Sequence, residues 1–375
     1  MRTIPLLCSI FISAGLANFA RAVPDSFIHL DVSVKFIVNP ATGQAPAGTD
    51  DANLRQTFDH MNRWLANTWR GYRLRLVDLD ASLNFKRIGG LSDTTGPGKW
   101  YNSDFKNDES LNHAFEDAAK AEAVLYGWNF SAINMYVNNG AWSSAQFPSG
   151  GWALVQTGYG LISNNVAPES YQTNNYKIAG NLLHEVGHFF ELYHTFGGGS
   201  DDGIADTAPD ILNRTGRNET TIRNDLAQLT WAVNYSALTA PQKILVDNTA
   251  NNAMSYYQLF YDDPEQDKEL TDAERFGPTR FVFTEQQMDK WADYANLQRA
   301  AVASGTMRFV QANAASTGIG TSTSPHKTLA LGIGAASSTG SDILILRPGT
   351  YTATTLTKPM TIRATREWPV TIQIP

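Results

Sequence analysis

The chain has 375 residues, of which 42% are hydrophobic and 17% charged, as in a globular protein with room for a full core. Its 36 acidic and 29 basic side chains give a formal charge of −7. Without any basic cluster, this charge argues against nucleic acid or an anionic membrane as the main partner. The single cysteine, Cys8, lies close to the N-terminus, so the rest of the chain has neither a disulfide nor a thiolate nucleophile.

Residues 1–22 have the pattern of a secretory signal peptide. Arg2 precedes an apolar run over residues 4–16, and residues 20–22 (Ala-Arg-Ala) provide a cleavage site of small residues. We therefore expect a secreted protein, extracellular or periplasmic, that is cleaved near Ala22. A membrane anchor is disfavoured because the run is short for a bilayer span, and no second segment of the sequence spans a membrane.

Hydrophobic periodicity predicts a sheet with covering helices in the next part of the chain. Residues 28–38 alternate apolar and polar side chains, which is typical of a half-buried strand. Residues 51–69 repeat their apolar side chains at helical spacing, which predicts a helix covering that sheet. The elements expected after these are a strand over 72–76, a loop over 86–107, a helix over 109–125 and a strand over 133–137.

The stretch from His184 to His194 has the spacing of a metal site. On a helix, the step from His184 to His188 places both imidazoles on one face about one turn apart, where both can reach a single metal ion. Glu185 is then close enough to take a proton from a metal-bound water without being a ligand. His194 supplies a third ligand, which leaves the fourth tetrahedral position of Zn²⁺ open for water, as in a catalytic site. The alternative is a buried amphipathic helix with chance histidines.

The helix that carries this motif should begin near Tyr176 or Lys177. Its buried face is expected to consist of Leu182, Leu183, Val186 and Phe190.

Around this motif the chain resembles the metzincin metalloproteases, and within them the pappalysin-like group, over roughly residues 27–302. The matching segments are 184–188 (His-Glu-Val-Gly-His), 192–196 (Leu-Tyr-His-Thr-Phe), 206–207 (Asp-Thr) and 252–256 (Asn-Ala-Met-Ser-Tyr), the last of which looks like the family's Met-turn. The resemblance implies a zincin catalytic domain of the α/β (α+β) class, with a twisted mixed sheet and an active-site helix. It also implies an edge strand beside the substrate cleft, which we expect over 152–156, where an extended substrate can pair.

The resemblance also gives roles to individual side chains. Met254 would form a thioether floor beneath the zinc histidines, and Tyr256 would donate a hydrogen bond to the oxyanion formed when water attacks the scissile carbonyl. In the acidic loop after the helix, the carboxylates are candidate ligands for Ca²⁺, as in the family's equivalent loop. The alternative is a solvated acidic turn, since the spacing fits no EF-hand. The carboxylates concerned are Asp201, Asp202, Asp206 and Asp210.

One position departs from the family's pattern. The glycine three residues after the second histidine, which lets the helix stop and the chain turn back, is Glu191 here. If the helix ends there, Glu191 adopts a left-handed conformation at a cost of about 1–2 kcal/mol. If the helix continues, Glu191 shares the face of His184 and His188 and can approach the metal. We expect the first arrangement, with His194 as the ligand.

Thr284 and Gln287 form a capping box that predicts a helix through about Val302. This helix should close a catalytic domain over residues 23–302. Its inner face is expected to carry Met288, Trp291 and Ala295.

The composition changes after this helix. Residues 303–320, rich in Ala, Ser, Thr and Gly, read as a linker. Residues 321–375 resemble the opening turns of a pectin-lyase-type right-handed β-helix. Because a solenoid needs at least about three coils, this small β-rich segment would be a shortened solenoid or an accessory domain. A polysaccharide is the contact that such a segment suggests.

The leading interpretation is a secreted zinc endopeptidase, a hydrolase acting on protein or peptide substrates with Glu185 as general base. The alternative is a metzincin scaffold that has lost catalysis and binds a polysaccharide or a surface. A carbohydrate-active enzyme seated in the β-helix is a third class, weakened by the small number of coils.

Overall fold

The computed structural model describes residues 26–46, 51–91, 99–102, 109–139, 144–145, 154–157, 171–196, 202–210, 219–257, 277, 279–314, 318–365 and 369–373. The signal peptide predicted over residues 1–22 lies outside this range. Among the described residues, no helix is both long and apolar enough to cross a membrane. The chain forms two compact units. The central unit consists of residues 31–67 and 74–287, and the terminal unit of residues 1–30, 68–73 and 288–375.

The central unit is built on a mixed sheet of six strands. The strand order is β2-β1-β4-β6-β5, and β3 also pairs with β1. β3 and β4 run parallel to β1, β6 runs parallel to β4, and β5 is antiparallel to β6. The bounds are β1 Ile28–Ile37, β2 Tyr72–Val77, β3 Lys86–Ile88, β4 Ile133–Val137, β5 Ser144–Ala145 and β6 Leu154–Thr157. The strands expected over 28–38, 72–76 and 133–137 are confirmed.

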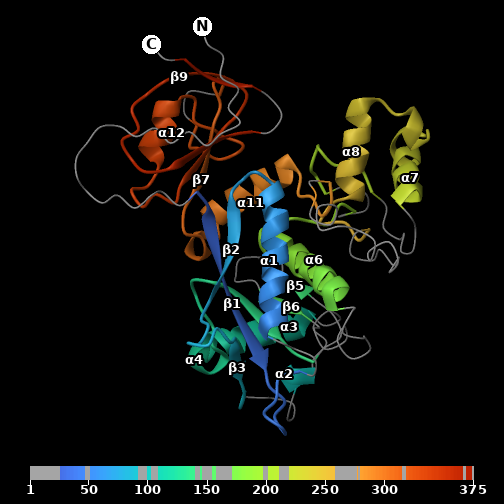
Figure 1. The fold of residues 1–375 in the computed structure, drawn as a ribbon, viewed down its shortest axis with the longest axis vertical. Coiled ribbons are helices and arrows are strands. Elements are labelled where there is room, and N and C mark those ends of the chain that lie inside the picture. The colour runs from blue at the N-terminus through green and yellow to red at the C-terminus, as the bar shows by residue number, and fades with distance from the viewer. Residues whose placement is uncertain are drawn as a thin grey trace. The chain divides into compact units, whose positions relative to one another are not determined.

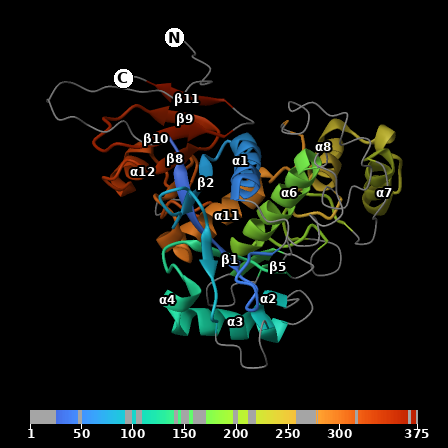
Figure 2. The same cartoon turned by 60° about the horizontal axis from the view of Figure 1, so that its bottom comes forward.

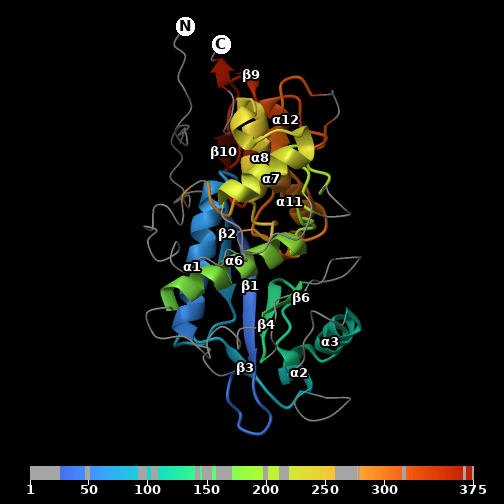
Figure 3. The ribbon, with the colours of Figure 1, turned by 90° about the vertical axis from the view of Figure 1, so that its right-hand side faces the viewer.

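Helices cover both faces of this sheet (Figure 3). α1 (Asp51–Asn67) packs against α6 (Tyr171–Phe189) on one face. On the other face lie α2 (Lys99–Asn102), α3 (Glu109–Ala121) and α4 (Ala123–Tyr126), which Figure 2 shows gathered beside one another. The core of this second layer is aromatic and includes Trp100, Tyr101, Phe115, Tyr126, Trp128 and Tyr136.

Three sequence expectations for this unit need correction. The segment predicted as a loop over 86–107 contains β3 and α2, because a three-residue strand with two charged side chains gives no alternation signal. The helix predicted over 109–125 is interrupted at Glu122, where φ is −115° and ψ 48°. β6 is not the edge strand, since it lies between β4 and β5, and the two-residue β5 forms the edge. Residues 152–153 of that expected strand lie outside the described residues.

A helical pair follows the candidate site and was not predicted. It consists of α7 (Glu219–Trp231) and α8 (Ala240–Ala250), joined through a 3₁₀ turn at Tyr235–Ala237 (Figure 1). A capping box of Thr239 and Gln242, with a proline in the first turn, begins α8. The pair has its own apolar core around Ile222, Leu226, Ala227, Val246 and Ala250.

In the terminal unit, short parallel strands are stacked in two sheets. One has the order β10-β8-β7, and the other pairs β11 with β9. The bounds are β7 Met307–Val310, β8 Ile343–Leu346, β9 Gly349–Thr352, β10 Thr361–Ala364 and β11 Val370–Gln373, with α12 at Leu329–Ala335. Successive strands β8 and β9 therefore pair with successive strands β10 and β11. The pairing does not demonstrate a β-helix, so the pectin-lyase resemblance stays a prediction.

The segment between the two predicted domains is partly ordered by strand pairing. β7 lies inside the range expected to be a linker, because its residues Met307 and Phe309 are buried and pair with β8. The helix predicted from Thr284 is α11 (Glu285–Leu297), followed by a 3₁₀ turn at Ala300–Val302. Its capping box is confirmed. The domain boundary after Val302 stays a prediction.

Candidate metal centre

The C-terminal half of α6 carries the first two histidines of the motif. The helix begins at Tyr171, earlier than the start expected near Tyr176 or Lys177. Its buried face is the predicted one, formed by Leu182, Leu183, Val186 and Phe190. His184 and His188 are themselves buried, with 2% and 5% of their surface exposed.

The end of α6 decides where the third histidine lies. The amide of Leu192 donates to Gly187 O at 3.0 Å and that of Glu191 to His188 O at 2.9 Å, a pairing that defines a Schellman motif. Glu191 has φ of 64°, so the left-handed conformation expected for this residue is confirmed. The helix therefore stops before Glu191, and the chain turns back toward its own last turn.

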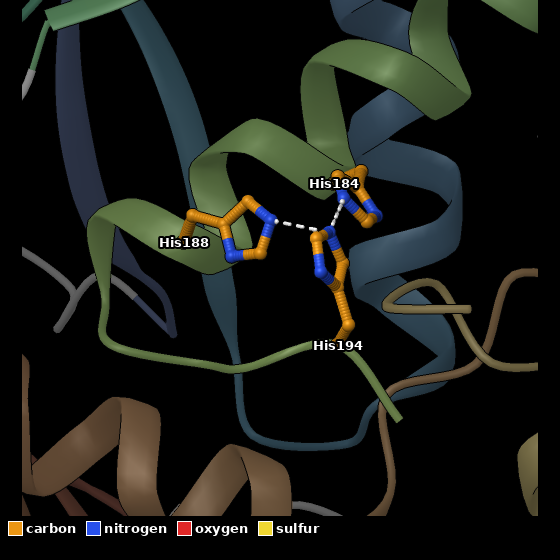
Figure 4. Close-up of side chains that lie close together, drawn as sticks. All are labelled: His184, His188 and His194. Carbon is orange, nitrogen blue, oxygen red and sulfur yellow. Dashed lines mark hydrogen bonds between the residues drawn. The ribbon is translucent and has the colours of Figure 1, made fainter. Parts of the chain in front are cut away.

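Three histidine nitrogens meet at this turn (Figure 4). His194 Nε2 lies 3.0 Å from His188 Nε2 and 3.1 Å from His184 Nε2. One ligand atom from each residue lies within 4.8 Å of the other two. A tetrahedral Zn²⁺ with bonds of about 2.0–2.1 Å holds its ligand nitrogens about 3.3 Å apart, close to this spacing. The three side chains therefore fit a zinc ion.

Backbone carbonyls orient the first two rings. Ala253 O lies 2.8 Å from His184 Nδ1, and Leu192 O lies 2.7 Å from His188 Nδ1. Because a carbonyl oxygen only accepts, each Nδ1 carries the hydrogen and each Nε2 keeps its lone pair for a metal.

Burial keeps these imidazoles neutral. It lowers the pKa of His184 to about 4 and that of His194 to about 3. The pKa of His188 is lowered well below its usual value, first by burial and then by the neighbouring histidines. Metal binding requires a deprotonated imidazole, so the triad is ready for a ligand role at neutral pH.

Hydrogen bonds after the motif hold the His194 segment. Thr195 Oγ1 donates to Asp210 Oδ2 at 2.9 Å, and the Thr195 amide donates to Met254 O at 3.3 Å. Tyr257 OH donates to the other oxygen of Asp210. The Phe196 ring stacks on His194, with centroids 4.5 Å apart and an interplanar angle of 15°. The segment that directly follows the third histidine is thus fixed in place.

Glu185 and Tyr256 are placed beside the triad. Glu185 is 8% exposed, and the Tyr256 ring centroid lies 4.9 Å from that of His194 and 5.9 Å from that of His184. Burial and then the Glu185 carboxylate raise the pKa of Tyr256, which keeps its hydroxyl a hydrogen-bond donor.

Met254 packs against α6 at Gly187. It is fully buried, and a Cβ added at Gly187 would lie 2.4 Å from its sulfur. Gly187, which our sequence analysis did not single out, therefore allows α6 to lie close to the Met-turn. Its position between the two motif histidines is the signal that identifies it.

The acidic side chains of the following loop do not converge on a point. Asp202 Oδ1 accepts from the Ile204 amide and Thr207 Oγ1, and Asp206 Oδ2 accepts from the Gln286 amide. Asp210 is engaged with Thr195, and Asp201 lies outside the described residues. In the described part of the chain, the histidine triad is the only group with the geometry of a metal site. The expectation of calcium is therefore not supported.

Comparisons with known proteins agree with this geometry. Residues 118–261, which contain the whole site, match the model of a peptidase family described as pregnancy-associated plasma protein-A. A Colletotrichum graminicola protein named extracellular metalloprotease is 37% identical over 89 residues, which cover 21% of this chain and 31% of that protein. The family model and this relative support the interpretation of the matched segment as that of a metalloprotease.

Two solved structures are similar to this chain at a lower sequence identity. Archaemetzincin from Methanopyrus kandleri is 15% identical, with 45% of this chain and 76% of that chain covered. OgpA from Akkermansia muciniphila is 12% identical, with 47% and 52% covered. Both have a TM-score of 0.27, at which the likeness carries no argument about this fold.

Proposed function

We propose that this protein is a secreted zinc endopeptidase. The observation that carries the proposal is the meeting of three neutral histidine nitrogens next to Glu185 and Tyr256. The match to a peptidase family over the same residues supports it.

His184, His188 and His194 would hold the zinc through Nε2. When bound, zinc supplies an activated water and polarises the carbonyl of the scissile bond. The carbonyls of Ala253 and Leu192 keep the His184 and His188 rings in the required orientation.

Two side chains beside the triad would take part in the reaction, one as general base and the other as a hydrogen-bond donor. Glu185 takes a proton from the attacking water and passes it to the leaving amine. The Tyr256 hydroxyl donates a hydrogen bond to the oxyanion that forms on the substrate carbonyl. Burial of Glu185 and partial burial of Tyr256 strengthen these interactions, since less water competes for them.

The substrate would be a protein or peptide, and the site of action outside the cell. The apolar run and cleavage site within residues 1–22 support secretion, and the relative named extracellular metalloprotease agrees with it. Polysaccharide contact through residues 321–375 stays a prediction that no observation here supports.

The test combines metal analysis with proteolysis of an unfolded protein. We expect one zinc per mature chain and proteolysis that a chelator abolishes. Glu185→Gln should keep the zinc but lose about 10²–10⁴-fold in kcat, because the general base is gone. Full proteolysis by this variant would refute the mechanism. A zinc-loaded wild type without any peptidase activity would favour the alternative of a binding protein on the same scaffold.

A further inference from the structure

Two buried amides, Asn252 and Gln287, face each other behind the candidate metal centre. They are 0% and 1% exposed. Asn252 Nδ2 donates to Gln287 Oε1 at 3.0 Å, and Gln287 Nε2 donates to Asn252 Oδ1 at 3.1 Å. The pair is therefore joined by two hydrogen bonds in opposite directions.

The remaining hydrogen-bonding positions of both amides are also used. Gln287 Oε1 accepts from the Thr284 amide at 3.0 Å, and Gln287 Nε2 donates to Asp202 Oδ2 at 3.3 Å. Asn252 Oδ1 accepts from the Met254 amide at 2.8 Å, and Asn252 Nδ2 donates to Asn248 O at 3.0 Å. A carboxamide offers two hydrogens and two lone pairs, so both side chains are fully satisfied. A buried network of this kind holds its members in one arrangement.

The network joins three segments that are far apart in the sequence. They are the loop over 202–207, the turn over 252–254 and the first turn of α11. The turn over 252–254 contacts the metal centre, because Ala253 O is the hydrogen-bond partner of His184 Nδ1. Displacement of this turn would therefore displace the group that orients the His184 ring.

Gln287 also donates a hydrogen bond to the Asp202 carboxylate. One oxygen of this carboxylate accepts from the Ile204 amide and Thr207 Oγ1, and the other accepts from Gln287.

We propose that Gln287 is a positioning residue of the metal centre. By crosslinking Asp202 to Asn252 it fixes the turn whose Ala253 carbonyl orients His184, and so maintains zinc affinity. The inference rests on the proposed function, since it assumes that the triad binds zinc.

The experiment compares Gln287→Ala with Gln286→Ala in the full mature chain. Gln286 is a matched control, because it is the neighbouring glutamine in the same helical turn and its side-chain oxygen accepts from the exposed Ala205 amide. The zinc dissociation constant is measured by competition with a chromophoric chelator, and the visible spectrum is recorded with Co²⁺ in place of zinc. We expect about 10–100-fold weaker zinc binding and an altered cobalt spectrum for Gln287→Ala. Gln286→Ala should match the wild type in both.

A second pair of variants separates positioning from general stability. Gln287→Glu keeps the shape of the side chain but places its carboxylate against that of Asp202, so zinc binding should weaken. Adding Asp202→Asn exchanges donor and acceptor across this contact and should restore part of the affinity. Because the second substitution also relieves the charge repulsion within the fold, zinc affinity is compared between variants whose folded fraction is the same. All measurements are made below the unfolding temperature of each variant, as followed by circular dichroism.

The outcomes distinguish this inference from the proposed function. A wild type that binds no zinc would refute the proposed function, and this inference with it. A wild type that binds zinc, together with folded Gln287 variants of equal affinity and unchanged cobalt spectra, would refute the inference alone. If Gln287→Ala does not fold, Gln287→Glu with and without Asp202→Asn decides in the same way.

Discussion

Glu191 is the residue at which this site departs from the glycine of the family it resembles. Its φ of 64° lies in the left-handed region, where a side chain costs about 1–2 kcal/mol. The Schellman hydrogen bonds to Gly187 and His188 offset that cost and hold the turn. Because Glu191 ends α6 here, it does not occupy the ligand position that a continued helix would have given it.

We predict that Glu191→Gly stabilises the protein. Relief of strain exceeds the additional unfolded-state entropy of glycine, about 0.5–1 kcal/mol, so the free energy of unfolding should rise by about 0.5–1 kcal/mol. Urea unfolding measures this, and Glu191→Ala, which keeps its Cβ, serves as the control without a gain.

Zinc affinity should be equal or higher in Glu191→Gly, whereas His194→Ala should lose most of the zinc. Zinc loss in Glu191→Gly alone would mean that Glu191 is a ligand.

Lys35 is a second unusual residue, because it is completely buried in β1. Its Nζ donates to Ser33 O and Asn134 Oδ1, two acceptors that match the two hydrogens of a neutral amine. Burial lowers the pKa of Lys35 well below its ordinary value, although the charge of Asp78 opposes the shift. The folded protein therefore binds a proton at this position less readily than the unfolded chain.

This shift predicts a stability that rises with pH. Between the lowered folded pKa of Lys35 and the unfolded value of about 10.4, the unfolded chain binds more protons, so the free energy of unfolding increases with pH. Lys35→Met removes this contribution and should flatten the rise. Urea unfolding at several pH values up to about 10 measures the difference from the wild type, with the exposed Lys327→Met as control. Identical slopes for the wild type and Lys35→Met would show that Lys35 is protonated in the folded state.

Among the elements, α6 lies directly against the turn over 252–254. Gly187 faces the sulfur of Met254, and Phe283 also lies close to the same point. The absence of a side chain at Gly187 brings the two segments together directly beneath His184 and His188. Glycine lowers the intrinsic stability of α6 at this position, because its helix propensity is about 1 kcal/mol less favourable than that of alanine.

We predict that Gly187→Ala destabilises the protein in spite of its better helix propensity. The added methyl overpacks the contact with Met254 by about 1–3 kcal/mol, which outweighs the gain of about 1 kcal/mol. Zinc affinity should fall as well, because both motif histidines flank this position. The double variant Gly187→Ala with Met254→Ala should lose less stability than the sum of the single variants, as measured by a double-mutant cycle in urea. Strict additivity would mean that the two residues do not meet.

At the scale of the whole molecule, α11 shares the terminal unit with the C-terminal strands. The side-chain amide of Asn296 pairs with both backbone groups of Met307, at 2.6 Å to its oxygen and 3.2 Å to its nitrogen. Asp293 accepts from the backbone and hydroxyl of Ser322. These contacts cross the boundary that the composition of the sequence suggested after Val302.

We therefore expect a chain ending at Val302 to be less stable than the full protein. The shortened chain loses the hydrogen-bond partners of Asn296 and Asp293. It also loses the burial of the Met307 and Phe309 side chains, and burial of each side chain contributes about 1.5–3 kcal/mol to the free energy of unfolding. Urea unfolding of the two chains measures the loss, and limited proteolysis of the full chain should spare β7. An unchanged unfolding midpoint for the shortened chain would confirm the boundary as that of an independent domain.

The sequence by itself determined those features that depend on neighbours along the chain. The alternating side chains of β1, the helical spacing in α1 and the capping box of α11 are local patterns, and the structure contains all three elements. The histidine spacing of α6 is local as well, because one helical turn sets the distance between His184 and His188. The left-handed Glu191 followed from the need to return His194 to the same helix.

Only the tertiary structure decided the features that join distant segments. β3 and β5 are too short for a periodic pattern, so their pairing partners define them. The contact of Gly187 with Met254 and the amide pair of Asn252 with Gln287 link positions 67 and 35 residues apart. These positions lie in local patterns of the sequence, namely the histidine motif, the segment over 252–256 and the capping box, but the patterns do not say which of the positions meet. The contacts between them are decided by packing and by the requirement that buried polar groups be satisfied.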